Sequence, residues 1–552
     1  MYKKRSVEMK NFSLKKIWGG LAILAVLLFI SGLFLTSAQR PQEKPQGLEE
    51  REENCTSIMV GRLASTDGSV MTAHSCDGNY RTWLNIVPHK KHPEGSKTKI
   101  YHGKMHNETS WDLRGLLLKG EIPQVSETYA FLNTAYPCMN EKQLAIGETT
   151  IGGRRELYNA EGLFVIEEIE RLILERCTNA RDAIRLAGEL VKEYGYGDRG
   201  ECITIADPKE VWHFEIFGAG PLEKGAVWAA ARIPDDHVGV SANIPRIAEL
   251  DLDNPDYFMA SDNVYSVAEE MEWWDPDSGE PFKFWKAYSG RKPFSTREYY
   301  ILSALAPSLN LDKEAEELPF SVKPDKKVSV RDVMKFYRET YEGTEQDMTK
   351  NLLVKPRRSD KKVKSPVANP WMSYDMRNLL NALKPGVIER FRTIAISGCS
   401  YSHIIQCRDW LPDPVGGIAW FSFDNPAQSP RIPIFSGVTE LLPSFEICAQ
   451  HRFRMDSACW AFRRANRLAT VRWGVARKFI EEAVKEFEER AFTDLPDIEK
   501  KALELYKKGG SEKDLEKVRE YLTKYTNDFA RAAIHKYLEL GDKFWGMFAR
   551  GF

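Results

Sequence analysis

The 552-residue sequence has almost no net charge, and this absence excludes several classes of function. Lysine and arginine together number 78 and aspartate and glutamate 79, so the formal net charge is −1. A protein that binds nucleic acid or an anionic membrane surface through a basic face carries a clear excess of positive charge. We therefore expect no nucleic-acid partner, and a substrate that is recognised at a local site.

Cysteine is sparse, with nine residues and no C-x-x-C pair. The nine do not form the dense block that is typical of a small disulfide-stabilised domain. Because the number is odd, at least one thiol stays unpaired, and most are expected to be buried as small apolar side chains. One or two disulfides remain open, and the sequence does not assign them.

Motifs for metal, nucleotide or serine-nucleophile chemistry are also missing. His89 and His92 stand in a lysine-rich stretch without further ligands at zinc-site spacing. Residues 251–256 resemble the start of a calcium loop, but Pro255 takes a ligand position and the required glycine and glutamate are absent. No glycine-rich phosphate loop and no G-x-S-x-G turn occurs. We expect neither a metal ion nor an organic cofactor.

One segment departs from the average composition of a soluble globular protein. Between Met1 and Lys16 six lysines and arginines stand against one acid, Glu8, and residues 17–35 then carry no charge. A helix of that length spans about 28 Å, near the thickness of a bilayer core. We expect an export signal, or an uncleaved anchor with its N-terminus inside, over residues 1–38. The folded body is then expected in the cell envelope, outside the cytoplasm.

The rest of the chain divides into a linker, a core and a helical end. Residues 39–54 are rich in proline, glutamine and glutamate, which indicates a linker or propeptide. A folded core is predicted over 55–442, with a loop-rich insertion at about 250–385, and a helical C-terminal region over 443–552. The core combines strands with a pair of helices, which favours the α+β class.

Local patterns predict the elements of this core. Asp67-Gly68 between two apolar runs is a strong hairpin signal, so a folded domain begins at Cys55. Two helices are expected within residues 160–194, separated near Asn179, which can cap the second. Further strands are predicted at residues 201–206, 211–217, 226–231, 237–242, 392–397, 400–406 and 416–423.

A cysteine that follows a removable leader and begins a strand has a specific chemical use. Once residue 54 is released, Cys55 carries a free α-amine, whose reference pKa is about 7.7–8.0 against about 8.5 for a thiol. The amine can then take the thiol proton near neutral pH, as in N-terminal-nucleophile enzymes. From position alone, a buried strand cysteine without catalytic function is the plainer interpretation.

Six stretches in fixed order carry a family resemblance. They are C-T-S-I-M-V-G-R-L-A-S-T-D-G-S-V-M-T-A-H-S-C-D-G (55–78), M-N-E-K-Q-L-A-I-G-E-T-T (139–150), W-A-A-A-R-I-P-D-D-H-V-G-V-S-A-N (228–243), Y-E-G-T-E-Q-D-M-T (341–349), C-S-Y-S-H-I-I-Q-C-R-D-W-L-P (399–412) and M-D-S-A-C-W-A-F (455–462). Together they resemble the C69-family dipeptidases, which are similar to choloylglycine hydrolase and penicillin V acylase among the N-terminal-nucleophile hydrolases. The resemblance implies a four-layer αββα sandwich, followed here by the helical C-terminal region.

The resemblance also implies roles for individual residues. Cys55 is the expected nucleophile, and Asp77 is the acid expected to hold its α-amine. Asn140 and Asn243 are the expected oxyanion donors, because a neutral amide stabilises developing charge without titrating. The expected substrate-binding residues are His74, Glu148, Thr149, Arg392 and Arg408, of which the two arginines are equal candidates for one position.

The sequence departs from the common family pattern beside the nucleophile. Many relatives have A-R-N-x-D where this chain has Ala-His-Ser-Cys-Asp at 73–77, so that His74 replaces a usual arginine. A histidine titrates near pH 6.5, so we expect an altered pH response, an altered substrate choice, or another way of holding the amine. Cys76 places a second thiol near the site, where a disulfide with Cys55 is conceivable.

We expect a cysteine peptidase that hydrolyses dipeptides or short peptides through a thioester on Cys55. The first alternative is an acylase or amidase acting on N-acyl amino acids, because fold and nucleophile alone do not separate the two. The second is an inactive binding protein of the cell envelope. A membrane partner is expected only if the N-terminal segment stays uncleaved. Self-cleavage by Cys55 is the preferred route of processing, and residue preference and homo-oligomerisation remain open.

Overall fold

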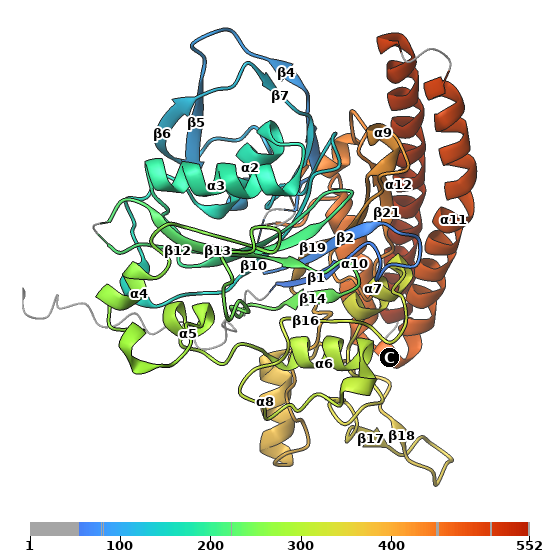
Figure 1. Ribbon diagram of the computed structural model, residues 1–552. Helices are drawn as coiled ribbons and strands as arrows, with labels where there is room; N and C mark the ends of the chain where they lie inside the picture. Colours follow the sequence, from blue (N-terminus) through green and yellow to red (C-terminus); the bar gives the residue numbers. More distant parts are fainter. Residues whose placement is uncertain are drawn as a thin grey trace, which may run out of the picture. The chain divides into compact units, whose positions relative to one another are not determined.

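A computed structural model describes residues 55–78, 80, 82–221, 223–448, 452–507 and 511–549. This part of the chain contains two large antiparallel sheets accompanied by helices (Figure 1), which is a mixed α and β architecture. The predicted signal or anchor at 1–38 and the linker at 39–54 lie outside the described residues. Among the helices that are described, none combines the length and the apolar character needed to cross a bilayer.

The first sheet carries the N-terminal hairpin at its centre. Asp67 and Gly68 lie in the predicted turn, and Gly68 has a φ of +87°, which glycine adopts without strain. The described parts of the predicted core and of the predicted helical C-terminal region belong to one compact unit. The strand order is β16 (Ser321–Val322), β14 (Val238–Ser241), β1 (Thr56–Val60), β2 (Val70–Asp77), β19 (Cys399–Cys407), β20 (Ile418–Phe423) and β21 (Ile432–Phe435).

The second sheet has eight strands, and each hydrogen-bonded pair within it is antiparallel. Its order is β15 (Phe258–Ala260), β13 (Ala226–Ile233), β12 (Val211–Gly218), β11 (Glu201–Ala206), β10 (Ala145–Thr150), β9 (Met139–Asn140), β8 (Phe131–Asn133) and β3 (Asn85–Val87). Three small ribbons complete the strands: β4 (Lys90–Lys91) with β7 (Glu127–Thr128), β5 (Lys97–His102) with β6 (Leu117–Pro123), and β17 (Leu353–Val354) with β18 (Val363–Lys364).

Helices pack against both sheets. The predicted pair is α2 (Ile166–Arg176) and α3 (Ala180–Tyr194); it lies over the second sheet (Figure 1), and Asn179 caps α3 as expected. Near the C-terminus, α10 (Ala458–Val471) and α12 (Glu512–Phe548) pack on β20 and β21, with α11 (Trp473–Lys507) beside them. The remaining helices are short: α4 (Ser266–Glu270), α5 (Phe284–Tyr288), α6 (Thr296–Leu305), α7 (Val330–Tyr337), α8 (Tyr374–Leu383) and α9 (Asp413–Gly416).

The two sheets approach each other closely where β1 and β2 pack on β10, β11 and β12. Gly147 of β10 lies at this approach, where there is no room for a side chain. A Cβ atom at Gly147 would lie 2.6 Å from the Thr204 Oγ1 and 3.0 Å from the Ala73 carbonyl oxygen, both closer than contact distance. Glycine at this position therefore lets the main chain of β10 reach the side chains of the N-terminal hairpin.

Two features differ from the sequence predictions. The strand predicted at 392–397 is wrong, because that segment is irregular and satisfies its polar groups locally: the Thr393 Oγ1 donates to the Ala395 carbonyl at 2.6 Å. The loop-rich region at 250–385 does consist of loops and short helices, but it also supplies edge strands β15 and β16 to the two sheets. All nine cysteines are buried free thiols.

Candidate active site

Cys55 directly precedes β1 and is only 1% exposed. Because Thr56 pairs with Ser75 across the hairpin, Cys55 falls opposite Cys76, and the two thiols are hydrogen-bonded neighbours. This bond with Cys76, then burial and the negative charge of Glu148, holds the pKa of the Cys55 thiol well above its usual value. The thiol therefore stays protonated until a base takes its proton.

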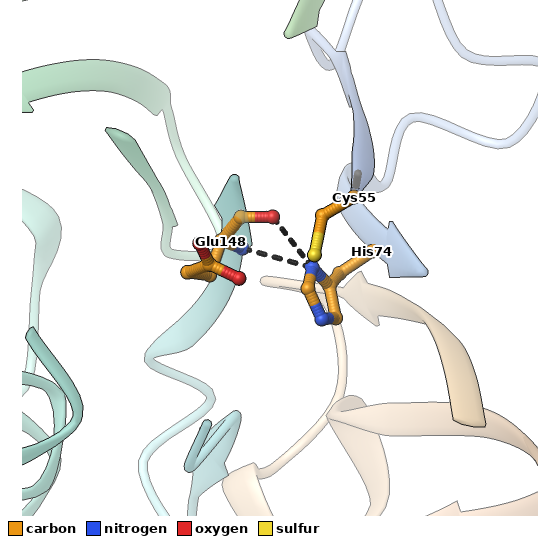
Figure 2. A group of neighbouring side chains, drawn as sticks. All are labelled: Cys55, His74 and Glu148. Atoms are coloured by element: carbon orange, nitrogen blue, oxygen red, sulfur yellow. Dashed lines mark hydrogen bonds between the residues drawn. The ribbon is translucent and has the colours of Figure 1, made fainter. Parts of the chain in front are cut away.

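His74 and Glu148 lie beside the thiol (Figure 2). The Cys55 sulfur, one ring nitrogen of His74 and one carboxylate oxygen of Glu148 all lie within 4.8 Å of one another. The His74 Nδ1 lies 2.6 Å from the carbonyl oxygen of Glu148 and 3.2 Å from its amide nitrogen, while Nε2 has no partner among the described residues. The nitrogen that faces Glu148 is thus engaged by the main chain and does not offer the free lone pair that a metal ion requires.

His74 is a neutral group in this setting. It is fully buried, and burial lowers its pKa to about 4. The expectation that His74 titrates near pH 6.5 is therefore wrong, because removal from water disfavours the imidazolium. No fixed positive charge replaces that of the usual arginine at this position.

Asp77 ends β2 and faces Arg392. The Arg392 Nη2 lies 2.7 Å from the Asp77 Oδ2, which also accepts a hydrogen bond from the Ser75 Oγ at 3.0 Å. The other carboxylate oxygen, Oδ1, is buried and has no partner among the described residues. Asp77 therefore keeps one acceptor oxygen for a donor near the nucleophile.

Arg297 is a site residue that the sequence reasoning missed. It lies in the first turn of α6 and donates to the Cys55 carbonyl at 2.5 Å, to the Thr56 Oγ1 at 2.8 Å and to the Asn243 Oδ1 at 2.9 Å. Burial lowers the pKa of Arg297 to about 10, so it stays cationic at neutral pH. No local motif marks this arginine, since α6 stands in the loop-rich region far from Cys55 in the sequence.

Asn243 and Thr149 also reach the neighbourhood of the nucleophile. Asn243 follows β14 with a left-handed φ of 67°, and its Nδ2 donates to the Thr150 carbonyl at 2.7 Å. It is half-buried, and Arg297 fixes its side-chain oxygen. Thr149 bonds through its hydroxyl to Ser241 at 2.5 Å and so links the two sheets.

Asn140 and Arg408 lie apart from this group. The Asn140 Nδ2 donates to the carbonyls of Leu174 and Cys177, both at 2.9 Å, so neither amide proton is free in this arrangement. Its oxyanion role stays a prediction. Arg408 follows β19 at the opposite end from Asp77 and binds the carbonyls of Val415 and Gly416. Of the two candidate arginines, the structure thus brings only Arg392 to the site.

A second acid, Glu201 of β11, accompanies Glu148. Glu201 pairs in register with Thr150, which puts it diagonally opposite Glu148 on the neighbouring strand. The two carboxyl groups share a hydrogen bond, and both residues are buried. Burial raises the pKa of Glu148 to about 7, and burial together with the charge of Glu148 raises the pKa of Glu201 well above its usual value.

Comparison with known proteins gives this arrangement a family context. The model of peptidase family C69 matches residues 54–486. The chain is 26% identical to a probable dipeptidase of Latilactobacillus sakei, over 70% of this chain and 75% of that protein. It is 27% identical to a probable dipeptidase of Salmonella dublin (70% and 82%) and 23% identical to dipeptidase A of Lactobacillus helveticus (74% and 80%).

Proposed function

The chain belongs to peptidase family C69, and we propose that it hydrolyses dipeptides or other short peptides with Cys55 as its nucleophile. The observation that carries the proposal is the environment of the buried Cys55 thiol. A Glu148 carboxylate oxygen lies within 4.8 Å of the sulfur, and Arg297 donates a hydrogen bond to the main-chain carbonyl of Cys55. The names of the relatives support a peptide substrate. We further propose that the two sheets and their helices form the αββα fold of N-terminal-nucleophile hydrolases.

The reaction begins with removal of the leader, which gives Cys55 a free α-amine. Since the thiol pKa is raised, a base must take its proton, and the adjacent α-amine is correctly placed to do so by covalent geometry. The unpartnered Oδ1 of Asp77 accepts a hydrogen bond from this amine, and Arg392 fixes the carboxylate through Oδ2. Cys55 then attacks the peptide carbonyl, the amine product leaves, and water hydrolyses the thioester.

Asn243 supplies the oxyanion donor in this proposal. Its amide has two N–H groups, one of which is donated to the Thr150 carbonyl, and its oxygen is held by Arg297. The second N–H is available for the developing oxyanion, and the charge of Arg297 strengthens that field. A donor of this kind contributes roughly a hundredfold to a thousandfold in rate in other hydrolases.

The acylase alternative is disfavoured by one feature of the site. The buried Glu148 carboxyl beside the thiol has no cation among the described residues, and it suits a substrate with a free amine better than an N-acyl group. We also propose export to the cell envelope, which the basic and apolar N-terminal segment supports, and self-cleavage at Cys55, which frees the α-amine that the N-terminal-nucleophile mechanism requires.

The test combines processing with a substrate panel. Intact mass and N-terminal sequencing of the wild type and of Cys55→Ala establish whether the mature chain begins at Cys55. Alanyl-alanine and N-acetylalanine are then offered to both proteins. We expect a wild-type chain that starts at Cys55 and cleaves alanyl-alanine, and an inactive, longer Cys55→Ala chain. Active wild type with an intact bond between residues 54 and 55, or activity in Cys55→Ala, would refute the mechanism. If the processed wild type cleaves no peptide, the alternative of an inactive binding protein of the cell envelope is favoured.

A further inference from the structure

Two buried carboxyl groups next to the nucleophile have no counter-charge. Glu148 is 0% and Glu201 4% exposed, and each has one carboxylate oxygen without a partner among the described residues. No lysine or arginine in the described part of the chain forms an ion pair with either of them. Asp198 adds a further negative charge that raises the pKa of both carboxyl groups.

This pair differs from buried glutamates that have an arginine partner, of which α2 supplies two. In α2, Glu168 and Glu175 are both paired with Arg171, at 2.7 and 2.8 Å. A buried carboxylate ordinarily requires such a partner, because desolvation of an uncompensated charge is costly. A hydrogen bond between two carboxyl groups requires a proton on one of them. The pair can therefore hold one proton and one negative charge, and the missing partner is a cation.

The position of the pair relative to the thiol defines which cation fits. In a peptide with a free N-terminus, the α-nitrogen lies about 2.5 Å from the first carbonyl carbon. A thiolate attacks that carbon from about 3–3.5 Å. The α-nitrogen then lies about 3–6 Å from the sulfur, and a Glu148 carboxylate oxygen lies within 4.8 Å of the same sulfur. An α-ammonium group is thus within hydrogen-bond reach of Glu148 when the carbonyl is positioned for attack.

We propose that the Glu148–Glu201 carboxyl pair is the binding site for the charged α-amino group of the substrate, and that Glu201 is its second, specificity-determining member. Glu148 contacts the ammonium, and Glu201 holds the remaining proton and keeps the Glu148 carboxyl oriented toward the thiol. This inference rests on the proposed function. An N-acylated substrate is rejected because it would leave the carboxylate buried without a cation.

The test measures covalent labelling of Cys55, which does not depend on turnover. Alanine chloromethyl ketone, with a free amine, and its N-acetyl derivative each alkylate Cys55 with loss of chloride. Labelling rates are followed by intact mass at about pH 7.5, where most of the reagent's α-amine is still charged and Glu148, whose pKa is raised to about 7, is largely ionised. The ratio of the two rates cancels changes in the reactivity of the thiol itself. The variants are Glu148→Gln, Glu201→Gln and the double variant.

We expect the wild type to react at least tenfold faster with the free-amine reagent. The single variants retain one carboxyl and part of this preference, whereas the double variant has a ratio within about twofold of one. Glu175→Gln is the matched control, because it changes a buried but arginine-paired glutamate, and it should keep the wild-type ratio. A double variant that keeps the wild-type ratio, or that loses both rates equally, overturns the proposal.

The result can be read even if a variant fails to fold. In the wild type, alaninamide should slow the labelling of Cys55 by iodoacetamide, while N-acetylalaninamide at the same concentration should not; equal protection by both overturns the proposal. Hydrolysis of alanyl-alanine is assayed in parallel. A free-amine preference without dipeptide hydrolysis would refute the proposed function and leave the ammonium site standing. Hydrolysis without that preference would refute the ammonium site alone.

Discussion

At the scale of single residues, the site is built from groups whose charges are set by burial rather than by their usual pKa values. His74 is the clearest example, because its ring is buried and neutral and its Nδ1 is held by the main chain of Glu148. At position 74, where many relatives have arginine, this chain has an uncharged ring that contacts the main chain of β10. We therefore predict that His74 positions Glu148 and does not sense pH near neutrality.

We predict that His74→Asn leaves the shape of the pH–rate profile unchanged between pH 5 and 9 while lowering the rate about tenfold through the lost hydrogen bond.

The effect of His74→Asn on stability depends on pH. Below pH 6.5 the unfolded imidazole binds a proton, whereas the folded one does not until about pH 4, so the wild type loses stability as the pH falls through this range. The difference in unfolding free energy between pH 7 and 4.5 should be about 2–3 kcal/mol smaller in His74→Asn.

Urea unfolding at the two pH values measures this difference. His535→Asn is the control, because His535 is exposed on α12 and should preserve the wild-type pH dependence. A rate inflection near pH 6.5 that disappears in His74→Asn would contradict the assignment of a neutral ring.

How much of the site the sequence predicts depends on how local each contact is. Cys55, Asp77 and Glu148 stand in recognisable motifs at β1, β2 and β10, and the structure brings them together. Arg297 stands in no motif, and only the packing of α6 against β14 carries its guanidinium to the Cys55 carbonyl. Arg392 and Arg408 were equal candidates in the sequence, because Arg392 reaches Asp77 from an irregular segment that no local pattern marks.

At the scale of elements, β10 is the strand that joins the second sheet to the nucleophile. The hydroxyl of Ser57 donates to the Glu148 carbonyl at 3.0 Å, and Gly147 provides the close approach that makes this contact. The sequence predicted the hairpin on one side of this contact, because its runs are apolar and joined by a turn, but it did not predict β10. It could not predict which face of one sheet meets the other, since that depends on contacts distant in the chain.

We predict that Gly147→Ala separates β10 from the hairpin, because the added Cβ would lie 2.6 Å from Thr204 and 3.0 Å from the Ala73 carbonyl. Overpacking of this kind costs about 1–3 kcal/mol, and the displacement of Glu148 should lower kcat/KM more than tenfold. Urea denaturation and peptide hydrolysis measure the two effects. Gly546→Ala, at an open position in α12, should be neutral or stabilising by about 0.5–1 kcal/mol. Equal behaviour of the two variants would argue against a sheet contact at Gly147.

At the scale of the whole molecule, the family match ends at residue 486, yet α12 lies beyond it and completes the packing of the first sheet. The Thr526 Oγ1 donates to the Pro433 carbonyl at 2.9 Å, and the Tyr537 hydroxyl donates to the Gln428 carbonyl at 2.6 Å. The helical pattern was predictable from the sequence over 443–552. Its partner surface was not, because the short strand β21 gave no periodic signal.

We predict that Phe529→Ala in α12 destabilises the protein by about 3–5 kcal/mol, although it lies outside the family match. Phe529 is 0% exposed, and its ring packs against Phe487 of α11 with centroids 5.6 Å apart, so truncation leaves a cavity between the two helices. Trp545→Ala, at a position 64% exposed on the same helix, should change the unfolding free energy by less than about 0.5 kcal/mol.

The stability of both variants is measured by urea denaturation, followed through circular dichroism and through peptide hydrolysis. Coincident loss of helicity and activity in Phe529→Ala would mean that α12 unfolds together with the catalytic core. Loss of helicity at lower urea than loss of activity would instead show that α12 unfolds separately, and that the part of the chain matched by the family stays active without it.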